Sequence, residues 1–187
     1  GVERLLDRIS NGVLAEDRQS AMADLRDVVT DSPVAQQALG AMGIPVLLSV
    51  LREDREDVDL IRGALEVLVA GLAAGAGGGG AEQREREWGQ QQQRVAPGVI
   101  NSELFAREPH SIALLLALLE EEDFYIRYHT VQLLTILLSN CPHRLQEAIL
   151  VIPQGVGRLM DMMALNEREV IRNEALVLMI NLTRSAE

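Results

Sequence analysis

The sequence has few aromatic residues, a single cysteine and no uninterrupted apolar run of membrane-spanning length. Aromatics make up 3% of its 187 residues, whereas apolar residues make up 48%. The core must therefore be built from Leu, Ile, Val, Met and Ala, which is typical of an all-helical protein. General disorder is excluded by the same apolar content. No segment is expected to cross a bilayer.

Cys141 has no second cysteine with which to form an internal disulfide, which fits a reducing, cytosolic compartment. The first four residues contain neither a starting Met nor a signal-peptide pattern. We therefore expect the sequence to be a fragment of a longer protein.

Basic residues are also scarce. Lys and Arg total 17 against 28 acids, which gives a formal net charge of −11. A phosphate backbone would be repelled, and no basic stripe compensates for the acidity. Nucleic-acid binding is therefore not expected.

An arginine-led helical pattern recurs four times along the chain. Arg18, Arg62, Arg127 and Arg172 each follow an acidic stretch and open an apolar segment. The positions three, seven and ten residues later are apolar in all but one case, Thr130. This spacing places them on one face of a helix. The twelve residues are Ala21, Leu25, Val28, Leu65, Val69, Leu72, Thr130, Leu134, Leu137, Ala175, Met179 and Leu182.

The spacing of these arginines predicts a repeat with one insertion. Their separations are 44, 65 and 45 residues, and two of these match the period of armadillo or HEAT repeats. Residues 73 to 98 are rich in Gly, Gln and charge and explain the long interval, so we interpret them as a flexible insertion. The predicted repeats lie near 1–31, 32–72, 99–139 and 140–187.

Prolines indicate three helices per repeat, as in armadillo proteins. Pro33 and Pro142 each lie fifteen residues after a leading arginine and open a short helical run. Each run ends near a Gly or Pro, at 43–45 and 152–155, and a second apolar helix follows. The sequence therefore predicts an all-α, armadillo-like, right-handed solenoid of about four repeats.

No catalytic, cofactor-binding or metal-binding residue is predicted. The glycine run 77–80 lacks the Gly-Lys-Ser/Thr ending and the preceding strand of a phosphate loop. Cys141 and His143 supply too few ligands for a zinc site. The acids 120–123 are adjacent on a predicted turn, whereas hydrolytic carboxylates face each other across a cleft. We interpret them as turn residues that oppose the positive end of the next helix.

Two short clusters are candidate partner contacts. Phe124, Tyr125 and Tyr128 are three of the five aromatic residues and flank Arg127, and such clusters anchor many protein interfaces. The alternative is that Phe124 and Tyr128 fill the core. One repeat further on, Arg172, Asn173 and Glu174 are further candidates, with hydrogen bonding between repeats as their alternative role.

Several segments resemble the globular head of a family of Golgi vesicle-tethering proteins, the general vesicular transport factors. The resemblance is carried by "LLLALLEEEDFYIRYHTVQLLTILL" and "GVGRLMDMMALNEREVIRNEALVLMINLTRSAE". "LLDRISNGVLAEDRQSAM" is similar to the start of that head in its plant and algal versions. Residues 73–98 depart from the family pattern.

This resemblance implies a function that the repeat pattern does not. It implies the armadillo-like head of a long cytosolic homodimer with a coiled-coil tail, which captures vesicles in ER-to-Golgi and intra-Golgi transport. The implied partners are Rab-type GTPases, SNAREs and Golgi matrix or coat proteins. Membrane association would then be peripheral and indirect, and the protein would not be an enzyme.

A second function class fits the repeats and the acidity equally well. An armadillo-type cofactor that regulates nucleotide exchange on a heat-shock ATPase would show both. It would not show the family-like segments.

Overall fold

The computed structural model describes residues 1–75, 95–164 and 166–185, and every regular element in these ranges is helical. The helices form four successive units. Unit 1 holds α1 (Val2–Asn11) and α2 (Ala15–Asp31), and unit 2 holds α3 (Pro33–Ala38), η1 (Leu39–Gly43), α4 (Ile44–Glu53) and α5 (Val58–Leu72). Unit 3 holds α7 (Pro97–Arg107), α8 (Ser111–Leu118) and α9 (Phe124–Asn140), and unit 4 holds α10 (Pro142–Val151), α11 (Gly155–Asp161) and α12 (Glu169–Ser185).

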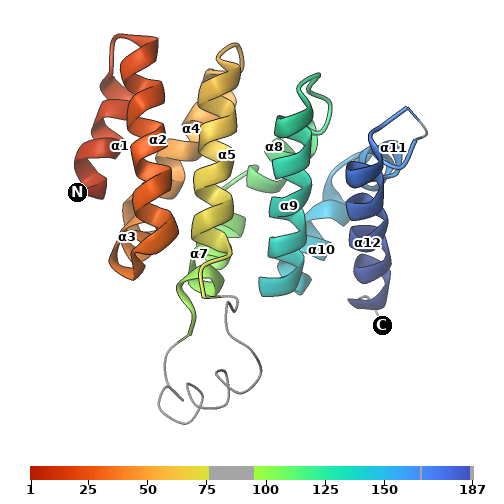
Figure 1. Cartoon of the computed structure of the whole chain (residues 1–187). Helices are drawn as coiled ribbons and strands as arrows, with labels where there is room; N and C mark the ends of the chain where they lie inside the picture. Colours follow the sequence, from red (N-terminus) through yellow and green to blue (C-terminus); the bar gives the residue numbers. More distant parts are fainter. Residues whose placement is uncertain (76–94, 165, 186–187) are drawn as a thin grey trace.

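The last helices of the four units lie side by side. Figure 1 shows α2, α5, α9 and α12 in a row, with the two chain termini at opposite ends. Each of them contacts its neighbour in the row, while α8 contacts α10 and α11 of the following unit. The chain is therefore an all-α, armadillo-like solenoid, as the repeat pattern predicts.

The predicted apolar face forms the core of this row. Eight of the twelve residues are buried in the structure: Ala21, Leu25, Leu65, Leu72, Thr130, Leu134, Leu137 and Ala175. Val69, Met179 and Leu182 are half-buried against the core. Val28 is 40% exposed, and its neighbour Val29 is buried in its place. Thr130 is tolerated because its hydroxyl donates to the carbonyl of Ile126, at 2.6 Å.

Side chains and prolines set where the helices begin. Asp57 and Asp123 accept hydrogen bonds from the backbone N–H groups of Leu60 and Ile126, which caps α5 and α9. Pro33, Pro97 and Pro142 stand at the start of α3, α7 and α10. The acids 120–123 lie in the turn between α8 and α9, as expected.

Unit 2 differs from the predicted break at residues 43–45. Pro33–Glu53 is one continuous helical run, in which the π-helical segment Leu39–Gly43 accommodates the glycines. Pro45 falls in the first turn of α4, directly after the π-helical segment. By length and composition this run could span a membrane, but a core helix meets the same criteria. Leu39, Leu47 and Leu51 on it are fully buried in the core.

The predicted insertion at 73–98 lies mostly outside the described residues, which exclude 76–94. Its end differs from the expectation, because α7 already begins at Pro97. Gly98 permits a close approach of α7 to the end of α5. A Cβ at Gly98 would lie 2.4 Å from the carbonyl oxygen of Leu72, so only glycine fits there.

Candidate interaction surface

The arginines that lead α2, α5 and α9 are fixed by carboxylates of the next unit. In the first pair, Arg18 Nη1 and Nη2 donate to the two carboxylate oxygens of Asp54, at 2.9 and 2.8 Å. Arg18 Nε donates to the carbonyl of Ile9, at 2.7 Å. Asp54 directly follows α4, so the pair joins unit 1 to unit 2.

The same arrangement recurs twice. Arg62 donates to both oxygens of Asp123, the N-cap of α9. Arg127 donates through Nε and Nη2 to Glu167, at 2.8 and 2.9 Å. We call these three pairs (Arg18–Asp54, Arg62–Asp123 and Arg127–Glu167) the arginine ladder. Such bidentate, charge-assisted contacts fix the register between units as well as their distance.

The arginines of the ladder lower the pKa values of the carboxyl groups with which they pair. Hydrogen bonds from Arg18 hold the pKa of Asp54 below its usual range, and those from Arg62 do the same for the pKa of Asp123. Desolvation alone would raise the pKa of Glu167. Hydrogen bonds from Arg127 and from a backbone N–H outweigh it and leave this pKa lowered.

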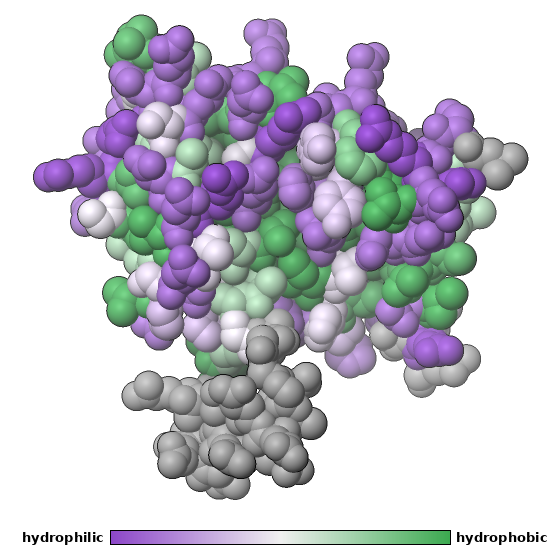
Figure 2. Space-filling model, viewed as in Figure 1, coloured by the Kyte–Doolittle hydropathy of each residue, from purple (hydrophilic) through white to green (hydrophobic). Residues whose placement is uncertain are grey.

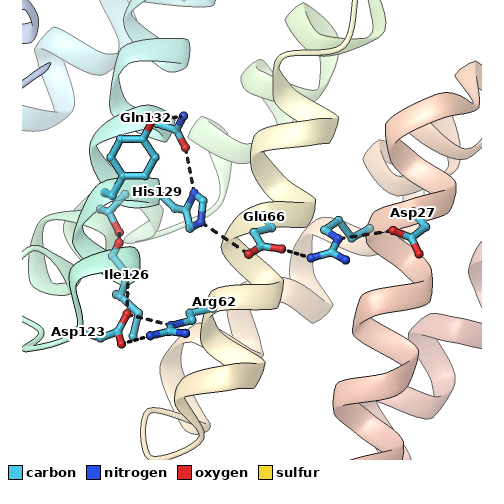
Figure 3. A network of polar contacts seen from close by, with 10 residues as sticks. Asp27, Arg62, Glu66, Asp123, Ile126, His129 and Gln132 are labelled. Carbon is cyan, nitrogen blue, oxygen red and sulfur yellow. Dashed lines mark hydrogen bonds and ion pairs between the residues drawn. The ribbon is translucent and has the colours of Figure 1, made fainter. Parts of the chain in front are cut away.

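A second polar chain crosses three units on the same face. Glu66 of α5 pairs with Arg26 of α2 and also lies near His129 of α9, and Figure 3 shows Glu66 and His129 facing each other. His129 Nε2 lies 3.6 Å from Glu66 Oε1, and its Nδ1 lies 2.9 Å from the side-chain oxygen of Gln132. The surface of the third helices is therefore a linked polar face rather than an apolar groove, and Figure 2 shows polar side chains over much of it.

The aromatic cluster lies at the start of α9. Phe124 stacks on Tyr128 with ring centroids 5.8 Å apart and meets Tyr125 edge-on at 5.1 Å. Guanidinium groups cover two of these rings: Arg62 lies 4.8 Å from the Tyr125 centroid and Arg168 lies 4.3 Å from that of Phe124. Tyr125 remains 50% exposed, whereas Phe124 and Tyr128 are half-buried.

The other predicted contact residues differ in how accessible they are. Arg127 is held by Glu167 and by the carbonyls of Glu121 and Glu122, and its side chain is only 16% exposed. On α12, Asn173 is exposed, while Arg172 and Glu174 are half-buried. Their contact with a partner stays a prediction.

Sequence reasoning missed the arginines that cover the aromatic rings. Arg168 connects the cluster on α9 to unit 4, although in the sequence it lies between two acids, Glu167 and Glu169. The alternation of acidic and basic residues before α12 was the only hint in the sequence that an arginine lies in this turn. It could not reveal that the side chain turns back toward the preceding unit.

The remaining titratable residues in the described ranges show no metal-binding cluster. His110 is the N-cap of α8, and its side chain makes no capping hydrogen bond. Burial raises the pKa of the Cys141 thiol to about 11, so the thiol is unreactive near neutral pH. Within the described part of the chain, no group of His, Cys, Asp and Glu could hold a metal ion.

Comparisons with known proteins show which family this chain resembles. Golgin candidate 6 of Arabidopsis thaliana is 50% identical over 186 residues, which is 100% of this chain and 19% of the relative. General vesicular transport factor p115 of Bos taurus is 36% identical over 98% of this chain and 18% of the relative. Intracellular protein transport protein USO1 of Saccharomyces cerevisiae is 26% identical over 96% of this chain and 11% of the relative.

This chain belongs to the family of Golgi vesicle-tethering proteins. Its identity is higher to the plant relative than to the bovine and yeast ones, which supports the plant type. A solved structure titled "Crystal structure of Uso1-2" has the same fold, with a TM-score of 0.78 at 23% identity over 97% of this chain and 28% of that chain. No family model matches the sequence.

The chain spans only about a fifth of the length of the plant and bovine relatives. These relatives bear names of Golgi and vesicle-transport proteins and give no support to the alternative of a nucleotide-exchange cofactor.

Proposed function

We propose that this chain is part of the head of a vesicle tether that acts in ER-to-Golgi and intra-Golgi transport. The observation that carries the proposal is the 50% identity to a golgin relative over the full chain. The fold supports it, because a row of coupled helical units offers an extended surface to protein partners.

The proposed mechanism is non-catalytic. The arginine ladder holds neighbouring units in fixed register, so partner contacts on different units keep their relative positions. A rigid surface loses less conformational freedom on binding than a flexible one. The proposed partners are Rab-type GTPases, SNAREs and Golgi matrix or coat proteins.

The proposed location is cytosolic, and peripheral on Golgi membranes and transport vesicles through these partners. In this proposal the complete protein is a homodimer with a coiled-coil tail.

The aromatic cluster at the start of α9 is the proposed contact site. Tyr125 is half-exposed and its ring is held by Arg62, so little side-chain freedom is lost when a partner covers it. Tyr, Phe and Arg are the residue types that dominate binding energy at interfaces. Arg168 adds an exposed guanidinium beside Phe124. Asn173 and Glu174 on α12 extend the site.

A cell-free ER-to-Golgi transport assay tests the proposal. The purified chain should compete with the endogenous tether and slow vesicle docking. Tyr125→Ala should weaken this competition about tenfold, since a hot-spot side chain contributes about 1–2 kcal/mol. Leu150→Ala is the matched control, because Leu150 is a 78% exposed apolar residue on α10 and is not part of the cluster.

The possible outcomes distinguish a failure of the proposed function from a failure of the proposed contact site. If the chain does not slow docking at any concentration, the proposed function of this segment fails. If Tyr125→Ala and Leu150→Ala compete equally with the wild type, the function holds but the aromatic cluster is not the contact. Circular dichroism of both variants checks that the array is intact.

A further inference from the structure

A cavity of about 200 Å³ lies between units 3 and 4, where α8 contacts α10. Its walls come from the start of α8, from Ala106 near the end of α7, and from Ala148, Val151 and Ile152 at the end of α10. Figure 1 shows α8 and α10 behind α9. The aromatic cluster follows the other end of α8, so the cavity is separate from the proposed contact site.

The hydroxyl of Ser111, a residue that lines this cavity, has no partner. Ser111 is 1% exposed, and its Oγ makes no hydrogen bond to any described residue. The turn itself does not need the hydroxyl, because unit 4 forms the same turn with a glycine. His110 and Gln154 have φ angles of 64° and 63°, and Gly155 follows Gln154 as Ser111 follows His110. A buried hydroxyl without a partner costs free energy, so its place beside a cavity points to a ligand.

The first turn of α8 also holds backbone N–H groups that no side chain caps. His110 stands at the N-cap and makes no capping hydrogen bond. The N–H groups of Ile112 and Ala113, two residues that line the cavity, meet no acceptor in the described ranges. Such groups are satisfied by a cap, by water or by a ligand. The cavity therefore combines an apolar wall with three groups that can donate a hydrogen bond.

The charges around the cavity favour an uncharged ligand. A carboxylate would accept from the donors, but Glu108 lines the same cavity and the chain carries a net charge of −11, so an anion would be repelled. A cation would leave the N–H groups unpaired and would face the positive end of α8. A neutral carbonyl oxygen accepts from the donors without either cost. A cavity of about 150 Å³ can bind benzene, so this one has room for a branched apolar side chain.

We propose that this cavity binds a segment of a partner protein, which inserts one apolar side chain against Ala148 and Val151 and presents a neighbouring main-chain carbonyl to the start of α8. A peptide carries both groups within one residue, which matches the apolar wall and the free donors. Val151 lines the cavity and is 77% exposed, so a segment bound there would cover it. The proposal is independent of the aromatic cluster and of the proposed role in transport.

NMR titration of the isotope-labelled chain with capped amino acids tests the proposal. The probe is N-acetyl-leucine N-methylamide, which has one apolar side chain and neutral carbonyls. We expect saturable downfield shifts of the amide protons of Ile112 and Ala113. The Kd should be on the order of 1 mM for a ligand of about 13 non-hydrogen atoms. The alanine analogue should bind about tenfold more weakly, because it buries less apolar surface.

Other probes decide the class of ligand. N-acetyl-leucine with a free carboxylate and N-acetyl-lysine N-methylamide should each bind severalfold more weakly than the neutral leucine probe. Equal or tighter binding of either one overturns the assignment of an uncharged ligand. A capped alanine–leucine–alanine tripeptide should bind severalfold more tightly than the single residue, and equal affinity overturns the assignment of a protein segment. If no probe gives a saturable shift, the cavity holds only water and the proposal fails.

Four substitutions test where the leucine probe binds. Ser111→Ala should weaken binding severalfold without lowering the Tm, whereas a hydroxyl that only stabilised the turn would lower it. Ala148→Leu should abolish binding by filling the cavity, and circular dichroism checks that the helices remain. Val151→Ala should weaken binding, but Leu150→Ala should not, because Leu150 is 78% exposed on the same helix and does not line the cavity. If Ala148→Leu binds as the wild type does, or the last two variants bind equally, the proposal is wrong.

Discussion

The pair of Arg127 and Glu167 should contribute more to stability than any exposed ion pair of this array. We consider Glu167→Gln, which keeps the size of the side chain and removes its charge. In the folded chain the two side chains are 16% and 9% exposed, and two charge-assisted hydrogen bonds join them. The substitution leaves a mostly buried guanidinium with weaker acceptors.

The magnitude follows from the burial of the pair. Breaking a fully buried pair costs about 3–5 kcal/mol, and an exposed pair contributes about 0–1 kcal/mol. Arg127 keeps its hydrogen bonds to the carbonyls of Glu121 and Glu122, which reduces the loss. We therefore expect about 2 kcal/mol, which lowers the Tm of a chain of this size by about 4–8 °C.

The assay is thermal unfolding at neutral pH, followed by a double-mutant cycle with Arg127→Leu. Glu103→Gln is the matched control, since Glu103 also pairs with an arginine of the next unit, Arg144, but the two side chains are 36% and 44% exposed. It should lower the Tm by less than about 3 °C. If Glu167→Gln lowers the Tm no more than Glu103→Gln does, burial does not determine how much a ladder pair contributes to stability.

Three further outcomes follow from the structure. The pKa values of Asp54 and Asp123 are lowered by folding, so the stability that these carboxylates contribute is present above about pH 4 and is lost as the pH falls through the folded pKa values. The Tm measured at decreasing pH should therefore fall more steeply for the wild type than for Asp54→Asn. Gly98→Ala should destabilise the array by about 2 kcal/mol or more, because its Cβ would meet the carbonyl of Leu72 at 2.4 Å, and urea unfolding measures this. Cys141 should resist thiol reagents at pH 8 until the chain is unfolded, since its pKa is raised to about 11; fast labelling of the folded chain would refute its burial.

Local sequence features were enough to predict an all-α fold and the buried faces of its helices. The arginine spacing identified the third helices, and all but one of the twelve predicted core positions are buried or half-buried. Prolines and acids marked the helix starts, because capping and the missing proline N–H act within one turn. The continuous run through Gly43 and Pro45 was missed, since a π-helical segment depends on packing of the whole unit.

The site was predicted less well, for a physical reason. Its decisive contacts join residues 36 to 61 positions apart, such as Arg18 to Asp54 and Arg62 to Asp123. A single sequence shows that acids recur before each third helix, but it does not show which arginine each acid holds. The same limit hid Arg168, whose position over Phe124 depends on how unit 4 packs against unit 3.

The turns before α9 and α12 hold residues that stabilise the array next to residues proposed to bind a partner. Asp123 of the ladder directly precedes Phe124, and Glu167 directly precedes Arg168. A substitution that breaks the Arg62–Asp123 or the Arg127–Glu167 pair is therefore expected to displace the aromatic cluster, even if the ladder residue never touches a partner. Loss of binding in a charge reversal at Arg127 would consequently not identify it as a contact. The informative variant is Tyr125→Ala, because Tyr125 is half-exposed and its side chain makes no hydrogen bond to another unit among the described residues.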